Sequence, residues 1–152
     1  MVAALLASGC KESNEGKGSR SGDRAVLLTK YGLKGHLAGE AKDPVVKDTS
    51  EGEQSVTGEN FTLIFALARA TDSKTPKEAQ EAAAFYQPKN IKSSNVAGGW
   101  ALTYEQDDPG GLTYVGKVRR TIADKEYFCD VLIVKTLEAR ERAVDFCISL
   151  TK

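Results

Sequence analysis

The most regular pattern of hydrophobic and polar positions lies in the segment GGWALTYEQ, residues 98–106. Trp100, Leu102 and Tyr104 alternate there with smaller or polar side chains. An alternation with a period of two is typical of a strand that buries one face. The segment therefore predicts a strand with these three side chains turned toward the interior.

Two further hydrophobic segments follow, and a short turn signal precedes each of them. The sequence DDPGG leads into residues 112–122, and ADK leads into residues 126–134. Because Asp, Pro and Gly favour tight turns, the three segments predict an antiparallel meander. Thr136 then provides an N-cap for a helix that we expect to end at about Leu150.

The N-terminal half of the chain carries weaker strand signals. AVLLTKYGL contains one expected strand, and DPVVKD contains a second, short one. ENFTLIFALARA is a firmer strand, whose apolar residues fall on both faces. We therefore expect this strand to be covered on both sides.

The segment SKTPKEAQEAAAFY carries a complete signal for the start of a helix. Thr75 is the expected cap, Pro76 takes the first helical position, and Glu78 closes a capping box. Pro88 ends the helix, and a polar link leads on to Trp100. A stripe of mostly small residues would allow the helix to approach a sheet closely. The stripe consists of Ala79, Ala82, Ala83 and Tyr86.

The order of these elements predicts an α+β fold with a mainly antiparallel sheet and a C-terminal meander. Because strands are apolar on both sides, we expect helices packed on one or both faces. By analogy of element order alone, a PsbP/Mog1-like sandwich is one architecture that fits. The chain has 152 residues, which suits a single domain over residues 25–152.

The charge balance argues against two classes of partner. Twenty-one basic and 21 acidic side chains give a formal net charge of zero. Nucleic-acid-binding domains normally carry a basic excess, and so do proteins that bind anionic lipid through polybasic segments. No segment approaches the ~18 apolar residues of a membrane-spanning helix. Any association with a membrane is therefore expected to be an attachment.

The first residues are typical of a processing signal and not of a folded element. MVAALLAS would form about two helical turns, which is too short to be stable alone. Cys10 is followed by KESNEGKGSRSGDR, fourteen residues without a hydrophobic side chain. Such a run cannot offset its ordering entropy by burial, so we expect a flexible tether.

Ala7-Ser8-Gly9-Cys10 resembles the lipobox of bacterial lipoproteins, in which small residues precede a lipidated cysteine. The resemblance implies that residues 1–9 are the remnant of a signal peptide and that residues 10–24 form the lipid anchor and tether. Lys11 implies the outer membrane, to which this family usually sends proteins without aspartate at that position. The alternative is a cytosolic protein with a frayed apolar N-terminus and a free thiol.

The C-terminal half resembles a group of uncharacterised Gram-negative envelope lipoproteins. The resemblance rests on GGWALTYE, YVGKVRRTI, KEYFCDVLIV and the closing CISLTK. It implies secretion and a shared fold, and it carries no activity with it.

Cys129 and Cys147 remain as a pair once Cys10 is assigned to the anchor. Cys129 lies about 16 Å before the end of its strand, at the rise of an extended chain. Cys147 lies about 15 Å into the helix that follows, at the helical rise. If the helix folds back antiparallel over the strand, the two sulfurs reach the same height, which predicts a disulfide. The alternative is two reduced cysteines in the core.

The sequence offers no catalytic motif, no metal site and no cofactor motif. His36 is the only histidine, and a Gly-x-Ser-x-Gly segment, a Cys-x-x-Cys pair and a phosphate-binding glycine loop are all absent. Glu105, Asp107 and Asp108 have the oxygen ligands that calcium takes. We favour a polar hairpin turn for this segment, since Asp, Pro and Gly have conformational reasons to occupy a turn.

Trp100, Arg119 and Arg120 are the candidate residues of an interaction surface. The two arginines are adjacent in a predicted strand, so each points to a different face. One is expected to pair with a helix carboxylate such as Glu138 or Glu141, and the other to meet solvent or an anionic partner. Trp100 is expected either in the core or at the lip of a groove.

These observations favour a non-enzymatic, lipid-anchored cell-envelope protein that faces the periplasm or the cell surface. Its domain would bind a protein partner or support an envelope assembly, with no cofactor and no nucleic acid. One alternative is a periplasmic carrier of a small apolar ligand, which requires a large apolar cavity. The other is a hydrolase that uses two facing Asp or Glu carboxylates alone.

Overall fold

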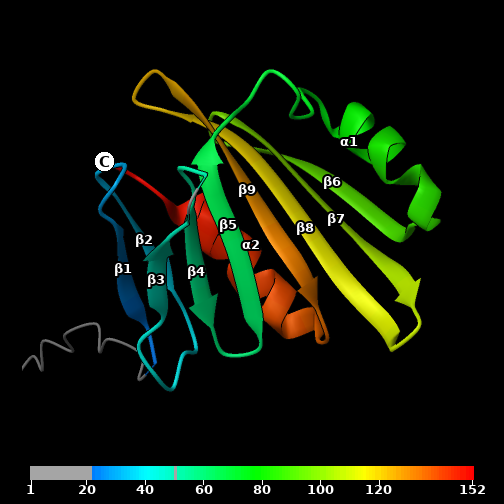
Figure 1. Ribbon diagram of the computed structural model, residues 1–152, viewed down its shortest axis with the longest axis horizontal. Coiled ribbons are helices and arrows are strands. Elements are labelled where there is room, and N and C mark those ends of the chain that lie inside the picture. The colour runs from blue at the N-terminus through cyan, green and yellow to red at the C-terminus, as the bar shows by residue number, and fades with distance from the viewer. Residues whose placement is uncertain (1–21, 50) are drawn as a thin grey trace, which may run out of the picture.

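The computed structural model describes residues 22–49 and 51–152, and within them it is an α+β fold built on antiparallel strands (Figure 1). Seven strands form one sheet in the order β3-β4-β5-β9-β8-β7-β6. They are β3 (Val45–Asp48), β4 (Gln54–Gly58), β5 (Phe61–Leu67), β6 (Lys89–Val96), β7 (Gly99–Asp108), β8 (Gly111–Ile122) and β9 (Lys125–Val134). The other elements are the hairpin of β1 (Arg24–Leu28) and β2 (Leu33–Leu37), the helices α1 (Pro76–Ala83) and α2 (Leu137–Ser149), and the 3₁₀ turn η1 (Ala84–Tyr86).

The hairpin and α2 cover one face of the sheet, which we call the back face (Figure 1). The main hydrophobic core lies between these two layers. It includes Leu28 and Leu33 of the hairpin, Phe65 and Val131 of the sheet, and Phe146 of α2. Each of these side chains is at most 2% exposed, so the core is closed to water.

The β1–β2 hairpin approaches α2 very closely at Gly35. A Cβ atom at this position would lie 2.7 Å from the ring of Phe146, which is closer than real Cβ atoms come. Glycine therefore allows β2 to pack directly on α2. Beyond the helix, Lys34 and Thr151 exchange two backbone hydrogen bonds of 2.9 Å, which tie the C-terminus to the hairpin.

The opposite face, which we call the front face, carries α1 and a smaller core. As predicted, Thr75 caps this helix: its Oγ1 accepts the backbone N–H of Glu78 at 3.2 Å, and Pro76 begins the helix. The buried side chains beneath the helix come mainly from β7. This core contains Ala79, Ala83, Trp100, Leu102, Tyr104 and Val115. Helices therefore pack on both faces, and the predicted meander β7-β8-β9 lies between them.

The predicted disulfide between Cys129 and Cys147 is confirmed, with the two Cα atoms 6.3 Å apart. Helix α2 begins at Leu137, with Thr136 as its N-cap, and runs back over β9 and β8. Both cysteines are 2% exposed, so the bridge lies inside the back-face core.

Arg120 holds the C-terminal end of α2, next to the disulfide. Its side chain projects from β8 to the back face, and its Nη1 donates to the carbonyl oxygens of Cys147 (3.3 Å), Leu150 (3.1 Å) and Ile148. The last carbonyls of a helix lack partners within the helix and carry its negative dipole end. A guanidinium therefore satisfies them and interacts favourably with the dipole. Its Nε also donates to the carbonyl of Ala97 at 2.9 Å.

The N-terminal part of the fold differs from the prediction. AVLLTKYGL was expected to hold one strand, but a turn divides it, with Gly32 at φ +63° and a 3.0 Å hydrogen bond from the Tyr31 N–H to Leu28 O. Strand β4 was not predicted. The polar link after Pro88 contains β6, an edge strand whose side chains are mostly exposed. An edge strand exposed on both faces has no hydrophobic alternation to reveal it.

Two further points concern the membrane and the domain boundary. Among the described residues, no helix has the length and apolar character needed to span a membrane. The expected tether reaches Arg24, but Arg24 already belongs to β1, and the Gly22 carbonyl accepts the N–H of Glu40 at 2.8 Å. The expected signal remnant and the rest of the tether lie outside the described residues.

The disulfide predicts a measurable loss of stability when it is removed. Replacing both Cys129 and Cys147 by alanine should lower the free energy of unfolding by about 3 kcal/mol, since the bridge closes a loop with a separation of 18 residues. Denaturant titration measures this loss. Mass analysis of native protein beginning after Cys10 should show two hydrogens fewer than the reduced chain. Two freely alkylated thiols in protein from an oxidising compartment would contradict the bridge.

Arg120→Met should destabilise the fold by about 2–3 kcal/mol, because the terminal carbonyls of α2 then lose a charged donor in a partly buried place. Arg120→Lys should recover only part of the loss, since one ammonium cannot reproduce the planar fork. Lys125→Met, at the exposed start of β9, is the control and should be nearly neutral. Equal stability of the Arg120→Met variant and the control would show that this cap contributes nothing.

Candidate functional site

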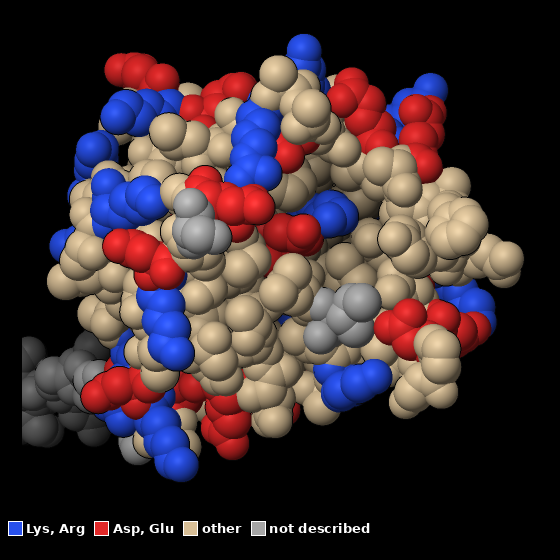
Figure 2. Space-filling view, viewed as in Figure 1, with Lys and Arg blue, Asp and Glu red and all other residues tan. Residues whose placement is uncertain are grey.

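The front face of the sheet is only partly covered by α1. Figure 1 shows α2 behind the sheet and α1 near β6 and β7, while β5 and β9 have no helix in front of them. Phe128 of β9 and Ile64 of β5 are half-buried on this open part. The space-filling view of the same face shows acidic and basic side chains together in a hollow near its centre (Figure 2). Two neighbouring clefts account for this hollow.

The first cleft, which we call the helix cleft, separates α1 and η1 from the sheet and has a volume of about 260 Å³. Its helix wall consists of small side chains, Ala79, Ala82 and Ala83, followed by Tyr86. Its sheet wall consists of Tyr104, Lys117, Phe128 and Asp130. The expected alanine stripe therefore packs on the sheet only at Ala79 and Ala83, while Ala82 and Tyr86 remain exposed and border the cleft.

An ion pair forms the floor of the helix cleft. The Nζ of Lys117 donates to Asp130 Oδ1 at 2.9 Å, and it lies 5.9 Å from the centroid of the Phe128 ring. Antiparallel pairing of β8 with β9 places these residues opposite each other. Both side chains retain contact with solvent, so the pair is bound to the sheet without complete desolvation.

Tyr104 lies beside this pair and is 4% exposed. Burial raises the pKa of its hydroxyl to about 12, and Asp130 and Tyr86 contribute to the increase. The hydroxyl therefore stays protonated at neutral pH and is able to donate a hydrogen bond. No side-chain hydrogen bond of the described residues involves this hydroxyl, and its oxygen is not among their fully buried polar atoms without a partner, so it meets the solvent of the cleft.

The second cleft, which we call the strand cleft, adjoins the first and has a volume of about 270 Å³. It shares Asp72, Phe128 and Asp130 with the helix cleft. Arg69 lines it and binds Glu53, with Nη2 2.5 Å from Oε1. Charges of both signs therefore line both clefts.

Trp100 and Arg119 hold the loop that forms the wall above these clefts. The indole Nε1 of Trp100 donates to the carbonyl of Lys74 at 2.9 Å. Arg119 Nη1 donates to the carbonyls of Asp72 and Ser73 at 3.3 and 3.1 Å. Both residues are buried, so the structure places them in the interior, where they position the loop.

The arginine pairing expected from the sequence is wrong in its partners. Arg119 and Arg120 do point to opposite faces, but neither meets Glu138 or Glu141. Arg119 pairs with Glu126 of the neighbouring strand at 2.6 Å. Arg120 binds the C-terminal carbonyls of α2, because the antiparallel return of this helix brings its last turn to Arg120 and leaves Glu138 in its first turn.

The acidic residues at the end of β7 make separate contacts. Glu105 accepts from the Asn90 amide at 2.7 Å, Asp107 pairs with Lys89, and Asp108 accepts from the Thr113 hydroxyl at 2.8 Å. Each carboxylate therefore has a separate partner. Among the described residues, no group of three or more acidic, histidine or cysteine side chains is placed to hold a metal ion.

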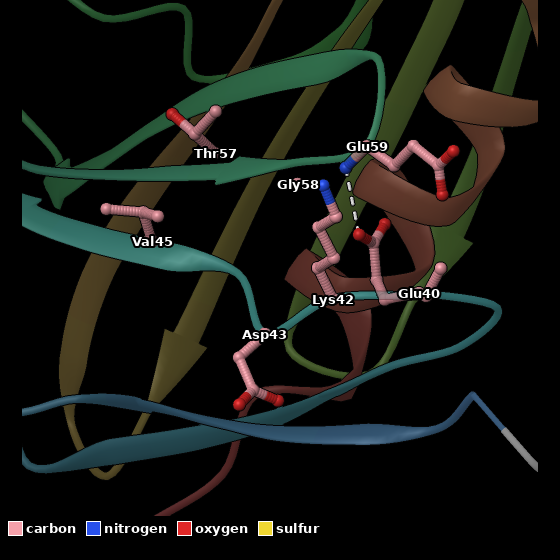
Figure 3. Close-up of a pocket in the computed structure, with 8 residues that line it drawn as sticks. Glu40, Lys42, Asp43, Val45, Thr57, Gly58 and Glu59 are labelled. Atoms are coloured by element: carbon pink, nitrogen blue, oxygen red, sulfur yellow. Dashed lines mark hydrogen bonds between the residues drawn. The ribbon is translucent and has the colours of Figure 1, made fainter.

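A third cleft, of about 340 Å³, lies between the β2–β3 connection and the β4–β5 turn (Figure 3). Figure 3 shows the Glu40 carboxylate turned toward the backbone N–H of Glu59, which donates to it at 2.8 Å. Glu40 is 1% exposed, and its other oxygen lies 3.5 Å from Nη1 of Arg142 in α2. Arg142 also donates to the carbonyls of Gly39 and Glu59 at 2.9 and 2.7 Å. These contacts fasten two loops to α2, so we interpret this buried charge as structural.

Sequence reasoning missed the most exposed aromatic residues. Phe85 is 88% exposed and Tyr86 is 56% exposed, and their rings make an edge-to-face contact with centroids 5.5 Å apart. Both follow α1 in η1, where Tyr86 borders the helix cleft and Phe85 precedes it in the chain. In the sequence, only the position of Phe85 outside the alanine stripe indicated that its side chain is exposed.

His36 has an exposed side chain on β2, and its backbone N–H donates to the Ser149 hydroxyl at 2.9 Å.

The open front face thus combines two adjoining clefts, an ion pair, the hydroxyl of a buried tyrosine and an exposed aromatic pair. No family model and no curated protein matches this sequence, and no solved structure matches this fold.

Proposed function

We propose that this chain is a non-enzymatic, lipid-anchored protein of the cell envelope whose domain binds a protein partner through the front face. The observation that carries the proposal is the exposed aromatic pair of Phe85 and Tyr86, of which Tyr86 borders the helix cleft. Aromatic residues are enriched at protein interfaces, where burial of their large apolar surface stabilises the complex. Left in water, the same side chains give the free domain no such stabilisation.

The mixed charges of the front face support a protein partner over a nucleic acid. Arg69 and Lys117 are each paired with a carboxylate, so the clefts present no basic stripe. Polar and charged groups of both signs around a hydrophobic patch are the usual composition of a protein interface.

The proposed compartment rests on the cysteines. A buried disulfide between Cys129 and Cys147 is typical of proteins that fold in an oxidising environment. Cys10 lies outside the described residues, and its resemblance to a lipobox cysteine supports attachment to the membrane. Together they favour an anchored protein of the outer membrane that faces the periplasm or the cell surface.

For the fold, the sheet backed by a hairpin and α2 supports a PsbP/Mog1-like sandwich as our proposal.

The two alternative functions receive less support. A carrier of an apolar ligand requires an enclosed apolar cavity, whereas both front-face clefts open to solvent and contain charged side chains. A carboxylate hydrolase requires two free facing acids. Asp72 and Asp130 do line the same clefts, but Asp72 Oδ2 accepts the Arg69 N–H at 2.6 Å and Asp130 is paired with Lys117.

The exposed aromatic pair predicts site-specific cross-linking in cells. A photoreactive phenylalanine analogue placed at Phe85 should form a discrete adduct with another protein, because this side chain would lie in the interface. Leu27 is the matched control, since it is also a large exposed hydrophobic residue but lies on β1, in the back layer. Tyr86→Ser should weaken the adduct formed at position 85. Identical adducts at both positions, or none at position 85, would contradict the proposed surface.

The anchor predicts palmitate labelling at Cys10. Protein expressed with its complete signal should enter the membrane fraction, and labelled palmitate should be lost in the Cys10→Ala variant. Gel fluorography after metabolic labelling measures both results. Labelling that persists in Cys10→Ala, or protein found wholly in the cytosol, would rule out the lipid anchor.

A further inference from the structure

We infer that the helix cleft receives one uncharged amide side chain, glutamine or asparagine, presented by an extended segment of the protein partner. This inference rests on the proposed function and specifies which chemistry the front face recognises. It depends on Tyr104, on the Lys117–Asp130 pair and on the size of the cleft.

The Tyr104 hydroxyl is the first observation. A buried tyrosine usually finds a partner for its hydroxyl, because an unpaired polar group removed from water is unfavourable. Tyr104 is 4% exposed and lines the helix cleft, but no side-chain hydrogen bond of the described residues involves its hydroxyl. Its oxygen is not among the fully buried polar atoms without a partner, so the hydroxyl meets the solvent of the cleft. The hydroxyl is therefore a polar group in the cleft that a ligand is able to satisfy.

The ion pair defines the charge of the ligand. Lys117 and Asp130 neutralise each other at 2.9 Å, so the floor of the cleft has no net charge to offer an ion. A charged ligand would have to break this ion pair or lose its own hydration shell beside it, and both changes have an unfavourable free energy. The pair still has unused capacity, since the ammonium has further N–H donors and Asp130 Oδ2 is an acceptor. A ligand with an adjacent acceptor and donor uses both, and a primary amide has that arrangement.

The size and position of the cleft favour a side chain over a free ligand or an added strand. Its volume of about 260 Å³ lies below the ~300–1,000 Å³ of ordinary small-molecule pockets. The backbone groups of β8 and β9 are already paired within the sheet, so a partner cannot add a strand there. The small side chains of Ala79, Ala82 and Ala83 leave room for one inserted side chain, while Phe85 and Tyr86 contact the segment outside the cleft.

The test is an NMR titration of the ¹⁵N-labelled folded protein with capped tripeptides. The probe is acetyl-Ala-Gln-Ala-N-methylamide, whose caps add no primary amide, and matched peptides carry Glu, Lys or Leu in the central position. The Gln peptide should shift the backbone amides of Tyr104, Lys117 and Asp130, with an affinity at least about fivefold higher than the others, as expected for one or two added hydrogen bonds. Equal or tighter binding of the Glu or Lys peptide would overturn the inference.

Tyr104→Phe separates binding from folding, because it removes only the hydroxyl. The variant should keep its melting temperature within about 2 °C, since no intramolecular bond is lost, and bind the Gln peptide at least about fivefold more weakly. Tyr114→Phe is the matched control: this tyrosine of β8 packs with Arg140 of α2 on the back face, so binding should not change. A fall of more than about 5 °C in Tyr104→Phe would assign the hydroxyl a structural partner and overturn the inference.

A final arm identifies the source of the amide. N-acetylglucosamine carries a secondary amide on a sugar. Stronger binding of this probe in the helix cleft would replace a protein side chain by a glycan and overturn the inference. The cross-linking result at Phe85 is independent of these titrations. If the peptides fail while the Phe85 adduct persists, the inference is wrong and the proposed binding face is retained.

Discussion

The return of helix α2 over the sheet is the constraint on which the rest of the fold depends. The Cys129–Cys147 disulfide fixes the helix to β9, and Arg120 fixes its last carbonyls to β8. Directly before these attachments in the chain, Phe146 and its neighbours meet the hairpin and close the main core. Because β2 contacts α2 through Gly35 and through the Lys34–Thr151 bridge, the hairpin takes its position from the helix. Detachment of α2 from the sheet would therefore expose the hydrophobic core that the hairpin and α2 cover.

Elements with local signals were predictable from the sequence, and those that depend on distant contacts were not. Thr75 and Pro76 start α1 through interactions within one helical turn, and the meander is recognisable from its alternation and turns. The disulfide was predictable because Cys129 and Cys147 lie at similar distances, along the strand and along the helix, from the turn that joins these two elements. Strand β6 escaped prediction because an exposed edge strand has no buried face, so its position is fixed only by pairing with β7.

The candidate site was harder to predict than the fold, since its residues come from separate elements. Tyr104, Lys117 and Asp130 lie on three different strands, and none belongs to a motif. Trp100 was predictable as a core residue from its alternation, but its hydrogen bond to Lys74 depends on a loop 26 residues away. The same holds for Arg119, whose two carbonyl partners belong to that loop. The sequence indicated Arg119 and Arg120 as charged residues of a surface, whereas in the structure both bind backbone carbonyls and hold the segments that carry them.

The polarity of the front face explains why it remains open. On β9, the residues that face α2 are Tyr127, Cys129 and Val131, whereas the front face presents Phe128 and Asp130. A helix laid directly over Asp130 and its partner Lys117 would have to remove both charges from water, which costs more than the pairing returns. Helix α1 instead packs over Leu102 and Trp100, and Trp100 and Arg119 hold the loop before it. Because α1 does not cover it, the Lys117–Asp130 pair is not fully buried by the fold. The pair is therefore accessible to a partner, whose polar groups would replace water and complete its hydrogen bonds.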